Sequence, residues 1–342
     1  MSKPNPRRRP DRPWRHWLWA GLFTVICLLV AYGWRQFLPL SPLSHEYAYI
    51  RVVPGETASQ IGTTLEYRKI IRSALAFDLA SRAANLSRTL KSGVYRLSPS
   101  DSLNTILRIM KSGDVVVIKV TIPEGFTVQQ VVARLVSAHI GTANQYQKLE
   151  QRPLSGMPRP MPGVRDPLEG YLFPATYSFP WGVTAKEALE TMWRTFRTDA
   201  LPLYLHVHSH LSMVQWVTLA SIVQQENNRA AEAPNIAAVF LNRIAMNMPL
   251  QSDATVRYAI GHPIDGGLSY QNLRVASPYN TYLSRGLPPG PIANPGLTAL
   301  SAALHPAPVG YLYFLTLPNG QMLFATTYQQ HLANIAYANA HY

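Results

Sequence analysis

The stretch VVVIKVTIPEGFTVQQVVARL, residues 115–135, has the pattern of a strand, a turn and a helix in succession. Its β-branched run predicts a strand, Pro-Glu-Gly at 123–125 predicts a turn, and Thr127 can cap the amphipathic helix expected to follow. The same order occurs in YIRVVPGETASQIGTTL, residues 49–65. We therefore expect these strand-turn-helix segments to form one small β/α subdomain over residues 47–140.

A second domain is expected further along the chain. The proline-rich residues 141–167 are typical of a connection between domains. Beyond them, over residues 168–342, apolar periodicity predicts several helices, and two short strands around Pro-Asn-Gly at 318–320 predict a hairpin. The mixture of helices and short strands indicates the α+β fold class.

The N-terminus has the pattern of a membrane anchor. Residues 1–16 contain six Lys and Arg side chains against one acid, and residues 17–34 contain no charged side chain. This uncharged run approaches the roughly 20 apolar residues that a membrane-crossing helix needs. A cleaved signal peptide is the alternative, but Arg35 and Gln36 follow the run in place of a small-residue cleavage site. We expect an uncleaved anchor helix at 17–36, with the basic tail in the cytoplasm and the bulk of the chain outside it.

Composition excludes several classes of function. The 342 residues include 31 basic and 18 acidic side chains, a net charge of +13, but beyond the tail the basic residues are scattered, so no nucleic-acid partner is expected. Cys27 is the single cysteine, which excludes a disulfide within the chain and a Cys-based metal site. The histidines of HVHSH, residues 206–210, have no carboxylate at ligand spacing. We expect neither a metal nor a cofactor.

Glu226 is the strongest candidate for chemistry from position alone. Trp216, Leu219, Ala220 and Val223 form one stripe of a predicted helix at 211–225, and Glu226 falls on the same stripe at its end. Desolvation there would raise the pKa of the carboxyl group and keep it protonated, as a general acid requires. Alternatively, the helix ends earlier and Glu226 is a solvated surface residue.

Several segments taken together resemble the endolytic murein transglycosylases, the YceG-like or MltG family. These segments are LEGYLFP at 168–174, LASIVQQE at 219–226, VFLNR at 239–243, MPLQSDATV at 248–256, SPYNTY at 277–282 and GLPPGPI at 286–292. The resemblance implies a LysM-like subdomain followed by a YceG-like catalytic domain, and it places the family's catalytic glutamate on Glu226. Gln224, Ala175 and Leu332 depart from the family's usual glutamate, aspartate and asparagine at those positions.

The reaction that the resemblance implies is non-hydrolytic cleavage of the β-1,4 bond between N-acetylmuramic acid and N-acetylglucosamine within nascent glycan strands, giving 1,6-anhydro ends. It also implies a location at the bacterial inner membrane, with peptidoglycan strands, the membrane and cell-wall synthases as partners. Polar and aromatic side chains in turns suit sugar surfaces, so we expect six substrate-binding residues. These are Glu232, Gln251, Asp253, Tyr258, Asn280 and Tyr282.

Two other functions stay open at this point. In a hydrolytic muramidase, Glu226 would be the acid and Asp253 would activate a water molecule, although an aspartate in such a polar turn often caps its own backbone. In an inactive peptidoglycan-binding scaffold, the chain would position other cell-wall enzymes. Gln224 is the feature of the sequence that favours the scaffold.

Overall fold

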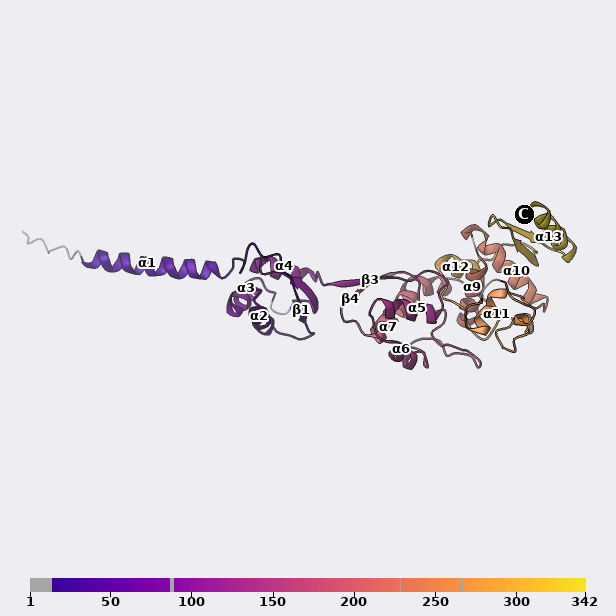
Figure 1. The fold of residues 1–342 in the computed structure, drawn as a ribbon, viewed down its shortest axis with the longest axis horizontal. Coiled ribbons are helices and arrows are strands. Elements are labelled where there is room, and N and C mark those ends of the chain that lie inside the picture. Colours follow the sequence, from indigo (N-terminus) through magenta and orange to yellow (C-terminus); the bar gives the residue numbers. More distant parts are fainter. Residues whose placement is uncertain (1–13, 87–88, 228, 265–266) are drawn as a thin grey trace, which may run out of the picture. The chain divides into compact units, whose positions relative to one another are not determined.

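The computed structural model describes residues 14–86, 89–227, 229–264 and 267–342, with side chains from residue 19 onward (Figure 1). The chain divides into two compact units, Met1–Val117 and Ile118–Tyr342. Each unit has its own hydrophobic core.

The first unit begins with helix α1, Trp14–Arg35. The expected cytoplasmic tail, residues 1–16, lies outside the residues whose side chains are described, as do the first two residues of the expected anchor at 17–36. In the part of the chain that is described, no helix is long and apolar enough to cross a membrane.

The rest of the first unit is a two-stranded antiparallel sheet packed with helices. Strands β1, Ala48–Val52, and β2, Gly93–Leu97, pair with Ile50 opposite Tyr95. The helices are α2 Ala58–Tyr67, α3 Ala74–Ala83 and α4 Leu103–Ser112. One core of buried side chains from both strands and all three helices holds this arrangement together.

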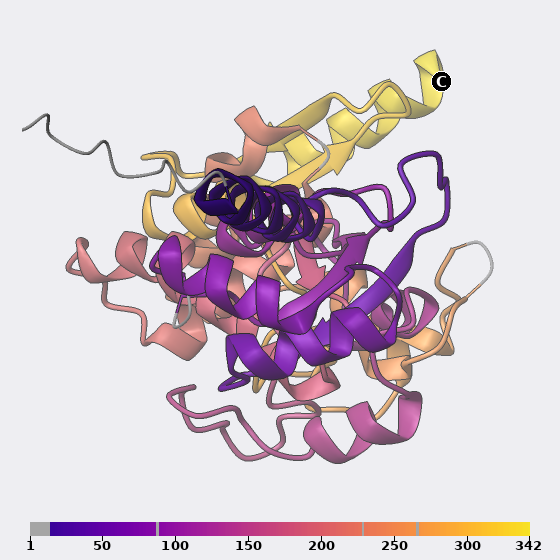
Figure 2. The same cartoon turned by 90° about the vertical axis from the view of Figure 1, so that its left-hand side faces the viewer.

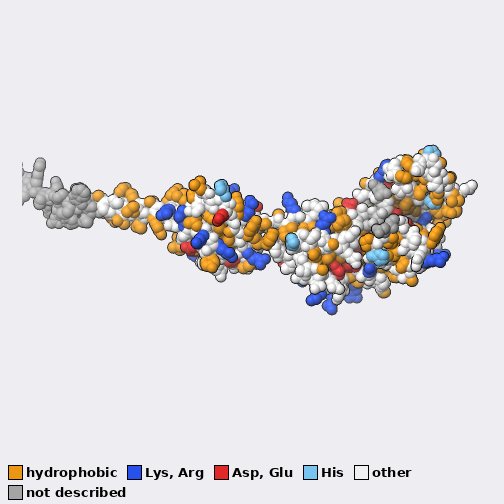
Figure 3. Space-filling model, viewed as in Figure 1, with side chains coloured by type: hydrophobic (Ala, Val, Ile, Leu, Met, Phe, Trp, Pro, Cys, Tyr) orange, Lys and Arg blue, Asp and Glu red, His pale blue; other side chains and the backbone are white. Residues whose placement is uncertain are grey.

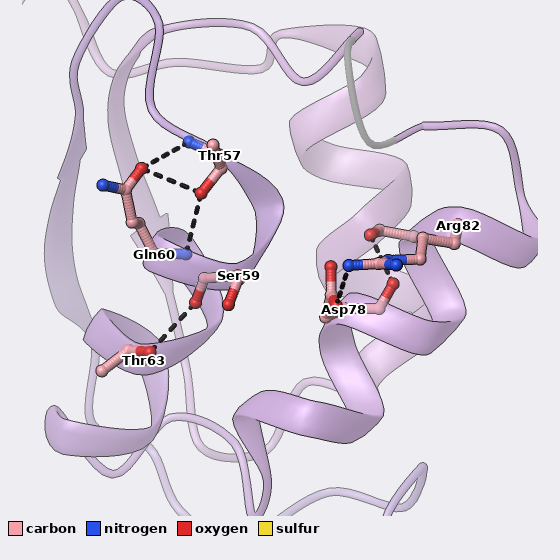
Figure 4. Close-up of polar contacts among 7 residues, drawn as sticks. Thr57, Ser59, Gln60, Thr63, Asp78 and Arg82 are labelled. Atoms are coloured by element: carbon pink, nitrogen blue, oxygen red, sulfur yellow. Dashed lines mark hydrogen bonds and ion pairs between the residues drawn. The ribbon is translucent and has the colours of Figure 1, made fainter.

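Local sequence signals fix where helices α2 and α3 begin and how they are stabilised. Thr57 caps α2, because its Oγ1 accepts the backbone N–H of Gln60 while the Gln60 side chain accepts the backbone N–H of Thr57 (Figure 4). In α3, Arg82 and Asp78 form an ion pair of 2.8 Å one turn apart (Figure 4). The predicted turn-cap-helix order at 49–65 is therefore confirmed.

The second unit begins at Ile118, inside the strand-turn-helix segment at 115–135. Strand β3, Val117–Thr121, pairs with β4, Thr176–Pro180, and helix α5, Val128–Ser137, follows the turn. Helices α6, Ala143–Leu149, and α7, Ala185–Thr195, complete a shared core. The segment that we expected within a subdomain over 47–140 thus packs into the core of the second unit.

The division between the units also differs from the boundary expected at 141–167. Helix α6 lies inside that range, and Leu154 and Met157 pack against two of the cores. The indole N–H of Trp193 donates to the backbone carbonyl of Ser155 at 3.1 Å. The proline-rich stretch is therefore a packed part of the second unit, because its apolar side chains have partners there.

The remainder of the second unit surrounds a buried central helix, α9, Met213–Glu226. Helices α10, Ala233–Ala245, α11, Asp253–Ile260, and α12, Leu297–Leu304, contact it (Figure 1). Shorter elements connect these helices: the π-helical turn η1 Phe196–Ala200, helix α8 Leu201–Leu205, and the 3₁₀ turns η2 Ala230–Glu232 and η3 Asn272–Arg274. The central position of α9 makes it the frame for the candidate site.

The predicted C-terminal hairpin is confirmed. Strands β5, Tyr313–Thr316, and β6, Met322–Ala325, pair antiparallel, and helix α13, Tyr328–His341, packs against both (Figure 2). Together with the two other short sheets, this hairpin gives the mixed helix and sheet content expected of an α+β chain. On the face shown in Figure 3, Lys and Arg side chains are dispersed among uncharged surface.

Candidate active site

Helix α9 carries Glu226 as its last residue. Ser212 caps the start of the helix in a capping box with Gln215, and the indole of Trp216 donates to the carbonyl of Leu300 at 2.8 Å. Every residue from 216 to 223 is buried, so α9 lies inside the unit and is not the one-sided helix that the stripe suggested. The helix therefore delivers Glu226 from the core to the surface of the unit.

The Glu226 carboxylate is bound by the beginning of a second helix. The hydroxyl of Ser252, the N-cap residue of α11, donates to Glu226 Oε1 at 2.6 Å, and the backbone N–H of Ala254 donates to the same carboxylate. Helix N-termini present unpaired N–H groups and a positive dipole end. The carboxylate thus lies between the C-terminus of α9 and the N-terminus of α11.

The surroundings raise the pKa of Glu226. Burial is the largest cause, and the negative charge of neighbouring Asp253 raises the pKa further. The hydrogen bonds from Ser252 and from the Ala254 backbone favour the ionised form and partly oppose the rise. A carboxyl group with a raised pKa keeps its proton nearer to neutral pH, and it can both donate and later accept a proton.

A set of buried hydroxyl groups fixes Ser252. Its backbone N–H donates to Thr281 Oγ1 at 3.1 Å, and the hydroxyl groups of Thr281 and Thr255 lie 2.8 Å apart. The Thr255 hydroxyl donates in turn to the carbonyl of Ser252 at 2.7 Å. All three side chains are buried, so the donor to Glu226 is held in place by groups that are themselves paired.

Two of the predicted substrate-binding residues meet beside Glu226. The hydroxyl of Tyr282 donates to Asp253 Oδ1 at 2.6 Å. The negative charges of Asp253 and Glu226 contribute to raising the pKa of Tyr282 after burial, and the charge of Arg243 opposes them. Arg243 is buried, donates to the carbonyls of Leu312 and Leu250 at 2.7 Å, and lies over the ring of Tyr313. Asp253 lines the cleft and Tyr282 binds Asp253 from outside the described lining, so the substrate contacts expected of both stay predictions.

Glu226 opens onto a cleft of about 1120 Å³. Its lining comes from segments far apart in the chain: the turn and first residues of α5, the end of α6, residues 160–169, Glu226, and helix α11 with the residues after it. Asp253 and Tyr258 are part of the lining. This volume is at the upper end of ordinary ligand pockets, which suits an extended ligand.

Besides Glu226 and Asp253, three carboxyl groups line the cleft, those of Glu150, Asp166 and Glu169, and sequence reasoning did not select them. Burial raises the pKa of Glu150. Burial raises the pKa of Asp166 to about 7 and holds that of Glu169 well above its usual range. Glu169 is bonded by the backbone N–H of Val128 at 3.1 Å, by Asn294 Nδ2 at 3.4 Å and by the hydroxyl of Tyr258. Tyr258, predicted to bind substrate, thus lines the cleft while its hydroxyl holds a buried acid.

The other three predicted binding residues lie elsewhere. Asn280 is fully buried, and its Nδ2 donates to the carbonyls of Leu273 and Val275 while its Oδ1 accepts the N–H of Tyr282. The structure therefore gives Asn280 a loop-stabilising role in place of the expected sugar contact. Glu232, on the η2 turn, accepts a hydrogen bond from the side-chain amide of Asn235. Neither Glu232 nor Gln251 is among the described residues that line the cleft.

Gln224 and Gln225, which precede Glu226 at the end of α9, bind the backbone of neighbouring segments. Gln224 Oε1 accepts the backbone N–H of Gly296, the N-cap of α12, at 2.9 Å. Gln225 Nε2 donates to the carbonyl of Gly125 at 2.7 Å, and the N–H of Gly125 donates to the carbonyl of Asn294. The Pro-Glu-Gly turn is therefore attached to the end of α9 next to Glu226.

The described residues contain no group of three or more His, Cys, Asp or Glu side chains placed to hold a metal ion. His206 of the HVHSH stretch lies with its Nδ1 2.6 Å from the carbonyl of Pro202.

Sequence reasoning missed Ser252 and three acids of the cleft lining, Glu150, Asp166 and Glu169. Ser252 stands between two residues that we did select, and its polarity next to Asp253 is the only local signal. Glu169 lies inside the LEGYLFP segment, where one acid among apolar residues was a usable sign of a buried carboxyl group. Asp166 stands just before that segment among prolines, and nothing in the local pattern distinguishes it.

Comparisons with known proteins show which family this chain belongs to. The YceG-like family matches residues 50–337. An endolytic murein transglycosylase of Bacillus subtilis is 32% identical over 321 residues, covering 88% of this chain and 87% of its own length. One of Streptococcus pneumoniae is 30% identical over 333 residues, covering 88% of this chain and 60% of its own length. The crystal structure of a YceG-like protein from Listeria monocytogenes is 33% identical, with a TM-score of 0.59, and covers 85% of this chain and all of its own. The chain belongs to the YceG-like family.

Proposed function

We propose that this protein is a peptidoglycan lytic transglycosylase that cleaves glycan strands internally, with Glu226 as its single acid and base. The observation that carries the proposal is the Glu226 carboxyl group, which has a raised pKa and lies at the mouth of a large cleft between two helix ends. The names of the relatives, endolytic murein transglycosylases, support the same reaction and substrate.

The first step is proton donation. Neutral Glu226 gives its proton to the glycosidic oxygen between N-acetylmuramic acid and N-acetylglucosamine, and the bond from that oxygen to C1 of the muramic ring breaks. Positive charge then develops at C1 and the ring oxygen, as in glycosidases. The resulting Glu226 carboxylate is stabilised by the Ser252 hydroxyl and the Ala254 N–H.

The second step uses the same carboxyl group as a base. The Glu226 carboxylate takes the proton of the C6 hydroxyl of the muramic ring, and O6 closes onto C1 to give the 1,6-anhydro product. Glu226 ends the cycle protonated, and no water is consumed. Because water does not attack, the paired acid and base of an ordinary glycosidase are not required.

The test is the chemistry of the product ends. A fragment from about residue 37 onward is incubated with uncrosslinked glycan strands, beside the Glu226→Gln variant, and the products are read by mass spectrometry. We expect 1,6-anhydro ends from the unaltered fragment and at least a thousandfold slower cleavage by the variant, the order of magnitude for loss of an essential proton donor. Equal rates for both proteins would contradict the role of Glu226.

Hydrolysis is the second candidate, because Asp253 lies beside Glu226 in the cleft. In that reaction Asp253 would activate a water molecule, and the product would carry a reducing end that contains one oxygen atom of the solvent. Cleavage in ¹⁸O-labelled water separates the two candidates, since only hydrolysis adds the label.

The feature that favoured an inactive scaffold has a structural role. The side chain of Gln224 accepts the backbone N–H of Gly296, and the side-chain hydrogen bonds of the described residues include none between Gln224 and Glu226. Its replacement of a glutamate therefore leaves the proposed acid untouched. A scaffold would bind glycan strands with the affinity of the enzyme and shorten none of them.

We also propose that α1 anchors the protein in the bacterial inner membrane as a single-pass helix, with both the LysM-like part and the cleft outside the cytoplasm. The support is the uncharged run at 17–34, all of which lies in α1, and the exposure of its large apolar side chains from Trp19 to Trp34. We expect the chain to resist extraction by alkaline carbonate and deletion of residues 1–36 to release it. Cell-wall synthases are the proposed neighbours, and their absence from a crosslinked pull-down would contradict that part.

A further inference from the structure

One wall of the cleft is lined by side-chain amides that the protein does not use. Gln129 at the start of α5, Gln147 near the end of α6 and Gln151 just after it all line the cleft. All three are exposed, and none makes a side-chain hydrogen bond to the described residues. Glutamines on the same two helices are used differently: Gln130 and Gln145 accept the N–H groups of Thr127 and Thr142 as capping residues.

The three amides belong to one surface. Gln147 and Gln151 are four residues apart, and the backbone stays helical through Glu150, so both side chains lie on the same face. Helices α5 and α6 pack together, with Tyr146 buried between α6 and the core. We call Gln129, Gln147 and Gln151 the glutamine wall.

The chemistry of a free primary amide matches that of an N-acetylated sugar. Each glutamine offers two N–H donors and one carbonyl acceptor without a charge. The acetamido group of N-acetylglucosamine or N-acetylmuramic acid offers one N–H donor and one carbonyl acceptor, also without a charge. A pair of such groups can form two reciprocal hydrogen bonds, and the cleft volume of about 1120 Å³ has room for more than one sugar ring.

We propose that the glutamine wall is a glycan subsite that binds the acetamido and hydroxyl groups of sugars on one side of the bond above Glu226. This inference rests on the proposed function and adds which residues hold the strand. Gln129 follows the Pro-Glu-Gly turn that Gln225 attaches to the end of α9, and all three glutamines line the same cleft as Glu226.

The experiment replaces the three glutamines together by alanine and uses peptide-free glycan strands as substrate. We expect KM to rise about tenfold or more, because several modest hydrogen bonds are lost, with kcat within about twofold. Asn144→Ala is the matched control, since Asn144 also carries an exposed primary amide on helix α6 but does not line the cleft. It should leave both constants unchanged. Thermal unfolding should be the same for all variants.

Binding to the Glu226→Gln protein separates this proposal from the proposed function. Affinity for peptide-free strands is measured by calorimetry with and without the three alanines, so no cleavage is needed. A loss of affinity of about tenfold supports the wall even if the chain proves inactive. Unchanged affinity overturns the proposal. An effect seen only with peptide-bearing strands also overturns it, because the wall would then bind the stem peptide.

Discussion

The hydroxyl of Ser252 donates to the carboxylate of Glu226 at 2.6 Å, although 26 residues separate them in the chain. Ser252 begins α11 and Glu226 ends α9, so the two helix ends meet at one carboxyl group. The C-terminus of α9 favours the neutral form and the N-terminus of α11 favours the ionised form. A group that gives a proton and then takes one back needs both forms within reach.

Removing the Ser252 hydroxyl should shift the decline of kcat/KM at high pH to a still higher pH. The hydrogen bond favours the ionised form, so its loss in Ser252→Ala raises the pKa of Glu226 further. Since the protonated form starts the reaction, the decline of kcat/KM at high pH should shift to higher pH, with a lower rate because the carboxyl group is less well held. The measurement is a pH profile of kcat/KM on glycan strands.

Asp253→Asn should shift the same decline in the opposite direction. The negative charge of Asp253 raises the pKa of Glu226, and asparagine removes the charge while keeping an acceptor for the Tyr282 hydroxyl. The pKa therefore falls, and activity should decline at lower pH than in the unaltered protein. Shifts of the same sign in both variants would show that the decline belongs to another group.

Asp166 makes the second unit less stable as the pH rises. Burial raises its pKa from 3.8 to about 7, so between about pH 4 and pH 7 the folded chain keeps a proton that the unfolded chain loses. The free energy of unfolding therefore falls across that window. Asp166→Asn should make this fall less steep, as measured by urea unfolding at several pH values, while Glu169 and Glu226 keep part of it. An unchanged slope would mean that Asp166 titrates normally.

Gly170 should tolerate no side chain. Its φ is +88°, and a Cβ atom would lie 2.6 Å from Pro291 and 2.7 Å from Val217. Gly170→Ala should lower the free energy of unfolding by about 3 kcal/mol through strain and overpacking. Gly286 has a φ of +77° with no atom near the Cβ position, so Gly286→Ala should cost about 1 kcal/mol. Denaturant unfolding measures both, and equal losses would contradict the steric argument.

Gln224 should affect stability more than catalysis. Gln224→Glu keeps the acceptor for the N–H of Gly296, so we expect kcat/KM within about threefold of the unaltered protein. Gln224→Leu leaves that N–H without its partner and should lower the free energy of unfolding by about 1–3 kcal/mol. A tenfold or larger gain of activity in Gln224→Glu would instead assign this position to the catalytic group.

Local sequence patterns were sufficient where the structure depends on local contacts. The caps, the helix that ends at Glu226 and the C-terminal hairpin follow from short-range signals and appear where they were predicted. Glu226 could be singled out because an acid continued an apolar stripe. The segments quoted from the sequence were also enough to recognise the family.

Contacts between segments that are distant in the chain could not be predicted from local sequence patterns. Strands β3 and β4 pair, and the hydroxyl groups of Thr121 and Thr176 lie 3.0 Å apart although 55 residues separate them in the chain. No local sequence pattern predicts that pairing. For this reason we expected a domain boundary at 141–167, whereas the two compact units divide between residues 117 and 118. Asn280 is a residue type that often binds sugars, but its side-chain amide donates to two carbonyls of its own loop. Only the three-dimensional structure distinguishes a ligand-binding asparagine from one that stabilises a loop.

The pairing of β3 with β4 determines where the chain can be truncated, or fused to another protein, without losing the catalytic part. A chain that began at residue 168 would lack β3, the Val128 N–H that binds Glu169, and the Gly125 carbonyl that holds Gln225. It would expose the apolar residues of a core that α5 and α6 now fill. A fragment that keeps the cleft intact therefore has to begin near residue 118. Gene fusions or truncations made at that position should retain a unit that can fold.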